Sequence, residues 1–149
     1  MKYLLINYDD ELIYIELDMK NIALRQIVIE NNLEKKIHIS CREDCLSEGE
    51  IDINQLVEYN CRLIKKEEFE IIWNSSINNY KSDWNKMKYK YSIEEEIEGI
   101  VSFYYPQGVI IIGSDFFAIC YNSEIGLINQ KIKVKVKGYD ELNMWLIVE

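Results

Sequence analysis

The sequence predicts an α+β protein: an N-terminal antiparallel β-meander with one long amphipathic helix, packed against a C-terminal five-stranded β-barrel. Three observations predict it. Residues 3–40 contain four short apolar or alternating runs, which is the pattern of strands. Residues 66–87 repeat apolar side chains at three- and four-residue steps, which is the pattern of a helix. From residue 97 onward, β-branched and aromatic runs are interrupted by five of the chain's six glycines, as in small antiparallel barrels.

The meander is predicted from runs at residues 3–7, 12–17, 24–30 and 36–40. Residues 8–11 form a polar turn, so the first two runs should pair as a hairpin. The fourth run carries the chain's only histidine, His38. Residues 41–54 are polar and acidic, and we expect an exposed loop there.

The helix is predicted by an apolar stripe that includes Phe69, Trp73, Ile77 and Trp84. Serines and asparagines at residues 75–79 are poor helix formers, and they should weaken its middle. Helical periodicity gives way to two-residue alternation near residues 88–93. We therefore predict two domains, residues 1–88 and residues 89–149.

The glycine spacing of the last third has a familiar form. Gly99 is followed by Val101 two residues later and by Gly108 nine residues later, and an apolar run occupies residues 109–111. This pattern resembles the S1 domain, a five-stranded barrel of the OB class, over residues 97–148. The resemblance implies that fold, and it implies binding of single-stranded RNA by base stacking on exposed aromatic side chains.

Two differences from the S1 pattern argue against RNA binding. Gln107 and Ile110 stand where the resemblance places the stacking aromatic rings, and residues 91–149 carry nine acidic and four basic side chains. The four basic residues alternate along one strand and share one face. That face is either a phosphate-binding stripe or a solvated surface that blocks edge-to-edge pairing. These residues are the candidate RNA site: Lys131, Lys133, Lys135 and Lys137.

The overall charge points toward a basic protein partner. The formal net charge is −9 and the pI is about 4.7, which opposes a broad nucleic-acid surface. The first residues lack a signal-peptide pattern, and no apolar run approaches the ~20 residues that span a bilayer. We expect a cytoplasmic protein that does not insert into membranes.

No motif predicts catalysis, and we expect neither an enzyme nor a cofactor. Phosphate loops, dinucleotide fingerprints and metalloprotease motifs do not occur in the sequence. One combination of side chains has the chemistry of a structural zinc site or, for a Cys–His pair, of a nucleophile. Its spacing does not match common zinc motifs, and unliganded thiols are the alternative. The four residues are His38, Cys41, Cys45 and Cys61.

The leading hypothesis is a protein-binding module. Exposed aromatic rings beside acids are typical of protein recognition, although the same rings also suit core and cross-strand pairs. Part of the N-terminal half, from Tyr14 through residues 67–73, resembles small bacterial immunity-type proteins, which implies a basic, nuclease-type toxin as partner. The candidate protein-binding residues are Tyr104, Tyr105, Phe116, Tyr121, Glu94, Glu95 and Glu96.

Overall fold

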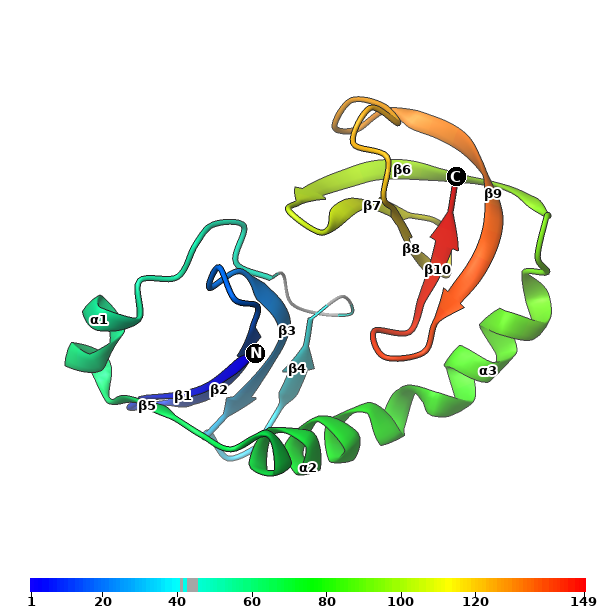
Figure 1. Cartoon of the computed structure of the whole chain (residues 1–149). Coiled ribbons are helices and arrows are strands. Elements are labelled where there is room, and N and C mark those ends of the chain that lie inside the picture. Colours follow the sequence, from blue (N-terminus) through cyan, green and yellow to red (C-terminus); the bar gives the residue numbers. More distant parts are fainter. Residues whose placement is uncertain (41, 43–45) are drawn as a thin grey trace. The chain divides into compact units, whose positions relative to one another are not determined.

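The computed structural model describes residues 1–40, 42 and 46–149. Its residues form two compact units, Met1–Asn79 and Tyr80–Glu149. The first unit contains an antiparallel sheet and the second a closed barrel, with helix between them in sequence (Figure 1). The predicted α+β class is confirmed.

The sheet of the first unit has five antiparallel strands in the order β4-β3-β2-β1-β5. The prediction anticipated four of them and missed the last, a three-residue strand that follows a polar, acidic segment. A short helix and a 3₁₀ turn precede that strand, and Asp52 caps the helix by accepting from the backbone N–H of Asn54 and Gln55. The elements are β1 (Lys2–Tyr8), β2 (Glu11–Leu17), β3 (Ala23–Glu30), β4 (Ile37–Ile39), α1 (Ile53–Leu56), η1 (Val57–Tyr59) and β5 (Cys61–Leu63).

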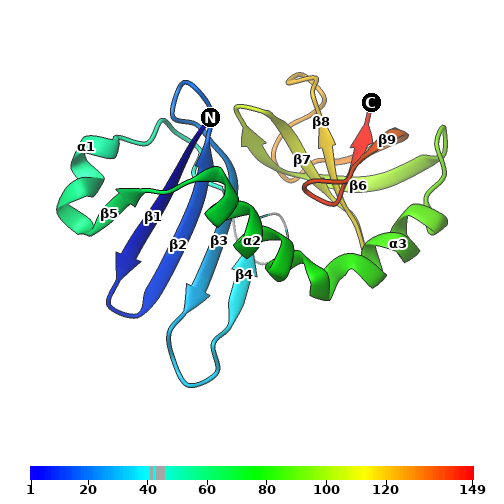
Figure 2. The ribbon, with the colours of Figure 1, turned by 60° about the horizontal axis from the view of Figure 1, so that its bottom comes forward.

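Helix α2 (Lys66–Ile77) crosses one face of this sheet (Figure 2). Phe69 and Trp73 are almost fully buried, and the Phe69 ring lies 5.3 Å from that of Tyr3 on β1. The other face of β1 and β2 carries Leu4 and Leu17, which are also fully buried. The sheet therefore contributes apolar side chains to the core from both faces.

The predicted helix is interrupted where its polar residues lie. A 3₁₀ segment, η2 (Asn78–Tyr80), separates α2 from α3 (Lys81–Lys90). Ser76 directs its hydroxyl back to the Ile72 carbonyl oxygen, 2.7 Å away, a bond that competes with regular helical geometry. The division between the two units falls within η2.

The second unit is a closed five-stranded barrel of mixed strand direction, in the order β10-β8-β7-β6-β9. Strands β8 and β10 are parallel, and the other neighbours are antiparallel. Val101, Ile111, Ala118 and Leu146 are fully buried and occupy paired positions on neighbouring strands. The strands are β6 (Glu96–Tyr105), β7 (Gly108–Ile112), β8 (Phe117–Cys120), β9 (Lys131–Asp140) and β10 (Trp145–Val148).

The last hairpin turns directly after Asp140, the residue at which β9 ends. The Asp140 carboxylate then accepts from the backbone N–H of Leu142 and Asn143 at 3.0 Å each, an Asx turn that ends the strand. Gly138 lies within the strand, opposite Ile147.

Both glycines of the S1-like pattern occupy crowded positions. A Cβ at Gly99 would lie 2.6 Å from the Ile111 side chain, and one at Gly108 would lie 2.7 Å from the Cys120 carbonyl oxygen. These spacings leave no room for a methyl group. The glycine pattern therefore reflects close strand approach in the barrel.

Among the described residues, no helix has both the length and the apolar character required to span a lipid bilayer.

Candidate functional site

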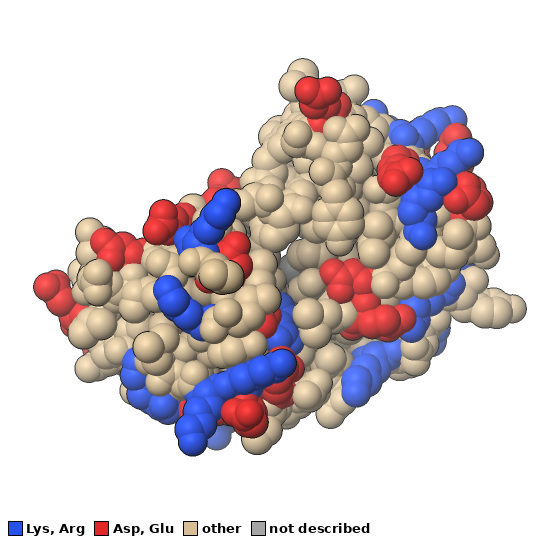
Figure 3. Space-filling model, viewed as in Figure 1, with Lys and Arg blue, Asp and Glu red and all other residues tan. Residues whose placement is uncertain are grey.

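The candidate lysine and glutamate surfaces of the barrel lie next to each other. Strand β9 pairs with β6, and Glu96, Glu98 and the preceding Glu94 face the lysines. Figure 3 shows acidic and basic side chains intermingled on this side of the barrel. The ion pairs are Lys131 with Glu98 at 2.6 Å, Lys133 with Glu96 at 3.5 Å and Lys137 with Glu94 at 2.7 Å.

This lysine–glutamate ladder, residues 94, 96, 98, 131, 133, 135 and 137, neutralises most of its own charge. The hydrogen bond to Lys137 lowers the pKa of Glu94, and the same bond raises the pKa of Lys137, so both groups stay ionised at neutral pH. A phosphate backbone or a basic protein would have to compete with these internal pairs. The ladder therefore suits a solvated strand pair better than either predicted binding surface.

The candidate aromatic residues divide by burial. Tyr105 and Phe116 are buried: Tyr105 stacks on Phe103 with ring centroids 5.9 Å apart, and Phe116 meets Tyr91 edge-on at 5.1 Å. They pack in the core, which was the alternative interpretation of these rings. Tyr104 is half-buried, whereas Tyr121 is 62% exposed.

Helix α3 is bonded to the last hairpin of the barrel. The Trp84 indole N–H donates to Glu141 at 2.7 Å, and Lys88 pairs with the same carboxylate at 2.6 Å. These two bonds lower the pKa of Glu141, that from Lys88 having the larger effect. The Tyr139 hydroxyl donates to the Tyr91 carbonyl at 2.7 Å. Lys88 of α3 thus has a structural partner within the second unit.

A second junction joins the end of α3 to the turn after β7. Lys90 pairs with Asp115 at 2.6 Å, and the Tyr91 hydroxyl donates to the same carboxylate. Hydrogen bonds from Lys90 and Tyr91 lower the pKa of Asp115. Its charge is therefore also compensated internally.

The net negative charge of the protein is concentrated in the first unit. Residues 1–79 contain 16 acidic and nine basic residues, a balance of −7, against ten acidic and eight basic in residues 80–149, a balance of −2. The second unit, which contains the candidate residues Glu94, Glu95 and Glu96, carries little of the excess negative charge.

Part of the excess lies around α1 and η1. Glu48, Glu50, Asp52 and Glu58 are exposed, and they take part in none of the ion pairs among the described residues. The composition of this segment indicates the negative charge, since residues 43–61 contain six acidic residues and no lysine or arginine.

Apolar side chains are exposed in the same segment. Val57, Tyr59 and Leu63 are 61%, 57% and 63% exposed. We call the combined set the α1 surface: the four acids Glu48, Glu50, Asp52 and Glu58 with Val57, Tyr59 and Leu63. It combines unpaired charge with exposed apolar area, whereas the ladder has paired charge.

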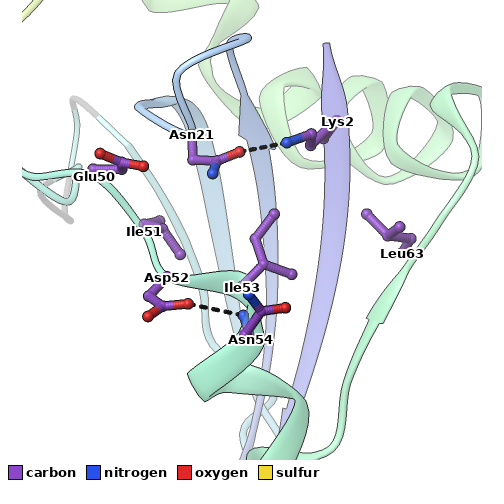
Figure 4. Close-up of a pocket in the computed structure, with 8 residues that line it drawn as sticks. All are labelled: Lys2, Asn21, Glu50, Ile51, Asp52, Ile53, Asn54 and Leu63. Atoms are coloured by element: carbon purple, nitrogen blue, oxygen red, sulfur yellow. Dashed lines mark hydrogen bonds between the residues drawn. The ribbon is translucent and has the colours of Figure 1, made fainter.

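A groove of about 690 Å³ adjoins this surface. Figure 4 shows Ile53 and Asn54 of α1 on one side of β1 and Leu63 of β5 on the other. At one end, Lys2 donates to the Asn21 side chain at 2.7 Å. Two acids, Glu50 and Asp52, line the wall that leads into α1.

The residues of the hypothetical zinc site lie far apart in the sheet. His38 and Cys61 lie on β4 and β5, the two edge strands, with three strands between them. Four strand spacings amount to about 19 Å, whereas ligands of one zinc ion lie within about 4 Å of each other. His38 instead contacts Glu30 at 2.8 Å. Cys41 and Cys45 lie outside the described residues, and no cluster of three metal-binding side chains occurs among those described.

A Cys–His nucleophile is excluded for Cys61 by the same separation. Burial also raises the pKa of the Cys61 thiol, which disfavours the reactive thiolate. Cys120 is fully buried in the barrel and is a free thiol.

The deepest charged group has a structural role. Arg25 is 2% exposed; it bonds Glu16 on the neighbouring strand and Glu70 on α2, the latter at 2.6 Å. Its guanidinium also lies 4.8 Å and 5.0 Å from the ring centroids of Phe69 and Trp73. The arginine thus ties α2 to the sheet, and sequence reasoning missed it.

Comparison with protein-family models, with curated proteins and with solved structures found no match to this chain.

Proposed function

We propose that this protein is a non-catalytic protein-binding module whose first unit covers a basic surface of a protein partner. The α1 surface carries the proposal, because its four exposed acids have no ion-pair partner among the described residues while Tyr59, Val57 and Leu63 beside them are exposed. Unpaired charge accelerates association with an opposite surface. Tyrosine is a frequent hot-spot residue at interfaces.

The immunity-type interpretation is the finer form of this proposal. An acidic module of this size suits the cationic active site of a nuclease-type toxin, which it would mask without chemistry of its own. Free thiols at Cys61 and Cys120 suit a reducing cytoplasm. A toxin gene beside the gene of this protein would favour that form.

The test compares two variants that remove the same number of charges. Glu48→Gln/Glu50→Gln/Glu58→Gln alters the α1 surface, and Glu94→Gln/Glu96→Gln/Glu98→Gln alters the ladder. Each protein is immobilised, and bound proteins are recovered from host lysate at low and high ionic strength. We expect one basic protein to bind the wild type and the ladder variant, and to be lost from the α1 variant. Equal recovery by all three, or no recovered protein at low ionic strength, would contradict the proposal.

The second candidate function is single-stranded RNA binding by an S1-like barrel. It is supported by the closed five-stranded order and by the parallel β8–β10 pair, which are compatible with an OB-like barrel. This function predicts that oligouridine binds with an affinity that falls steeply with salt. Replacement of the four ladder lysines by glutamine should then abolish binding. No binding at low ionic strength would remove this candidate.

A further inference from the structure

We propose that the partner adds an extended, lysine- or arginine-containing segment to the free edge of β5, as a sixth strand of the N-terminal sheet. This inference rests on the proposed function and specifies its binding mode. Strand addition is a recurring mode of peptide recognition: main-chain hydrogen bonds supply affinity, and alternate side chains supply specificity.

The hydrogen-bond register identifies the free edge. The backbone N–H of Asn7 donates to the Asn60 carbonyl, and the N–H of Ile64 donates to the Tyr3 carbonyl. Because antiparallel strands alternate, residues 60, 62 and 64 bond toward β1. The main-chain groups of Cys61 and Leu63 therefore point away from β1, on the side where the sheet has no further strand among the described residues.

Leu63 makes this edge receptive to an apolar side chain. It pairs with Leu4 in register, and its own side chain is 63% exposed. Together with Ile51 and Ile53 it lines the groove beside β1 (Figure 4). A side chain of an added strand that points to this face would cover Leu63 and shield it from water.

The charges around the groove select the incoming segment. Glu50 and Asp52 line it, and both are exposed, whereas the one basic residue of its lining, Lys2, donates to Asn21. Arg62 does not oppose a basic segment, since its guanidinium pairs with Glu68 of α2 at 2.8 Å. Side chains two residues apart lie on the same face of a strand, about 7 Å apart. A segment that carries a basic and an apolar side chain two residues apart, on the face shared by Leu63, Glu50 and Asp52, therefore has the complementary chemistry.

The probe is the heptapeptide Lys-Thr-Val-Thr-Lys-Thr-Val, whose lysines and valines share one face of the strand, and its control replaces both lysines by glutamate. Backbone amide NMR of the full-length protein should show shifts at residues 61–64 and 50–54 with the lysine peptide alone. Leu63→Pro removes an N–H that points outward, and proline is compatible with such edge positions. We expect it to weaken peptide binding by at least about tenfold, through the lost bond and the added ring.

The matched control lies at the other edge of the same sheet. Backbone bonds from Glu30 to Lys36 and from Ser40 to Gln26 place Ile37 of β4 in the same outward register. Ile37→Pro should leave peptide affinity unchanged. Should Leu63→Pro fail to fold, a peptide with N-methylated valines tests the same bonds on the wild-type protein, and it should bind about tenfold more weakly or worse.

Three results would overturn strand addition at β5: no binding of the lysine peptide, equal affinity for the glutamate peptide, or equal affinity of the Leu63→Pro and Ile37→Pro variants. The lysate experiment distinguishes a failure of strand addition from a failure of the proposed function. If the Glu48/Glu50/Glu58 variant loses the lysate partner while Leu63→Pro retains it, the partner binds the acidic surface in another way. If both variants retain it, the proposed function fails too.

Discussion

The Lys137 ammonium lies 2.7 Å from the Glu94 carboxylate, so the two segments with the densest opposite charge in the barrel neutralise each other. Considered separately, the two segments favoured different partners. The lysines favoured RNA, and the glutamates favoured a basic protein. Their pairing across β6 and β9 removes much of the basis for both. Most of the net negative charge lies in the first unit, −7 in residues 1–79 against −2 in residues 80–149.

The first prediction concerns the lysines that these glutamates cover. Glu94→Gln/Glu96→Gln/Glu98→Gln leaves Lys131, Lys133 and Lys137 of β9 without their ion-pair partners. Oligouridine binding at low ionic strength should therefore rise about tenfold or more, with a steeper salt dependence. Fluorescence anisotropy of a labelled oligonucleotide measures it. The control is Glu48→Gln/Glu50→Gln/Glu58→Gln, which changes net charge equally. An equal gain in both variants would assign the effect to total charge.

The second prediction concerns the buried arginine. Arg25→Met leaves the buried Glu16 carboxylate without its cation, so the free energy of unfolding should fall by about 3–5 kcal/mol. Urea denaturation measures the change. The control, Arg62→Met, removes an exposed arginine from its pair with Glu68, and should cost less than about 1 kcal/mol. Similar losses in the two variants would contradict a special role for Arg25.

Much of the fold could be predicted because it rests on local periodicity. The first three strands, the helix and the barrel each span enough residues to show an alternating or helical pattern, and the crowded glycines at 99 and 108 mark the barrel. Strand β5 has three residues and no such pattern. Its pairing with β1 depends on a long-range contact that no local signal encodes.

The candidate site was less predictable, because charge pairing depends on register. Nothing in the spacing of Glu94, Glu96 and Glu98 shows that they face lysines some forty residues later. Alternation also cannot show whether Tyr105 and Phe116 are covered. Conversely, residues 41–54 were predicted from their polar, acidic composition as an exposed loop, and in the described part of that range Glu48, Glu50 and Asp52 are exposed.

The third prediction is a loss of stability in acid. The hydrogen bond from Arg25 lowers the pKa of Glu70, and those from Lys88 and Lys90 lower the pKa of Glu141 and Asp115. Each folded pKa lies below its ordinary value of 4.5 for Glu or 3.8 for Asp, so the unfolded state binds protons first as the pH falls. The stabilisation is present above about pH 5 and is lost progressively below it.

Urea denaturation at a series of pH values tests this third prediction. The unfolding free energy should fall continuously below about pH 5. Glu141→Gln should have a shallower slope, because its side chain no longer takes up a proton on unfolding. A slope unchanged by this substitution would show that Glu141 does not contribute.

The fourth prediction tests the glycine that follows the β6–β7 turn. In Gly108→Ala, the new Cβ would lie 2.7 Å from the Cys120 carbonyl oxygen on β8. Because that oxygen belongs to the backbone of a barrel strand, it cannot rotate away as a side chain would. Strands β7 and β8 must therefore separate locally, which should cost about 1–3 kcal/mol.

Gly49→Ala is the matched control for Gly108→Ala, since a Cβ there meets nothing within 4 Å. Its unfolding free energy should stay within about 0.5 kcal/mol of the wild type. Thermal and urea unfolding of the two variants decide the matter. If Gly108→Ala were as stable as Gly49→Ala, the second glycine of the S1-like pattern would not be required by strand packing, and its match to that pattern would carry no structural weight.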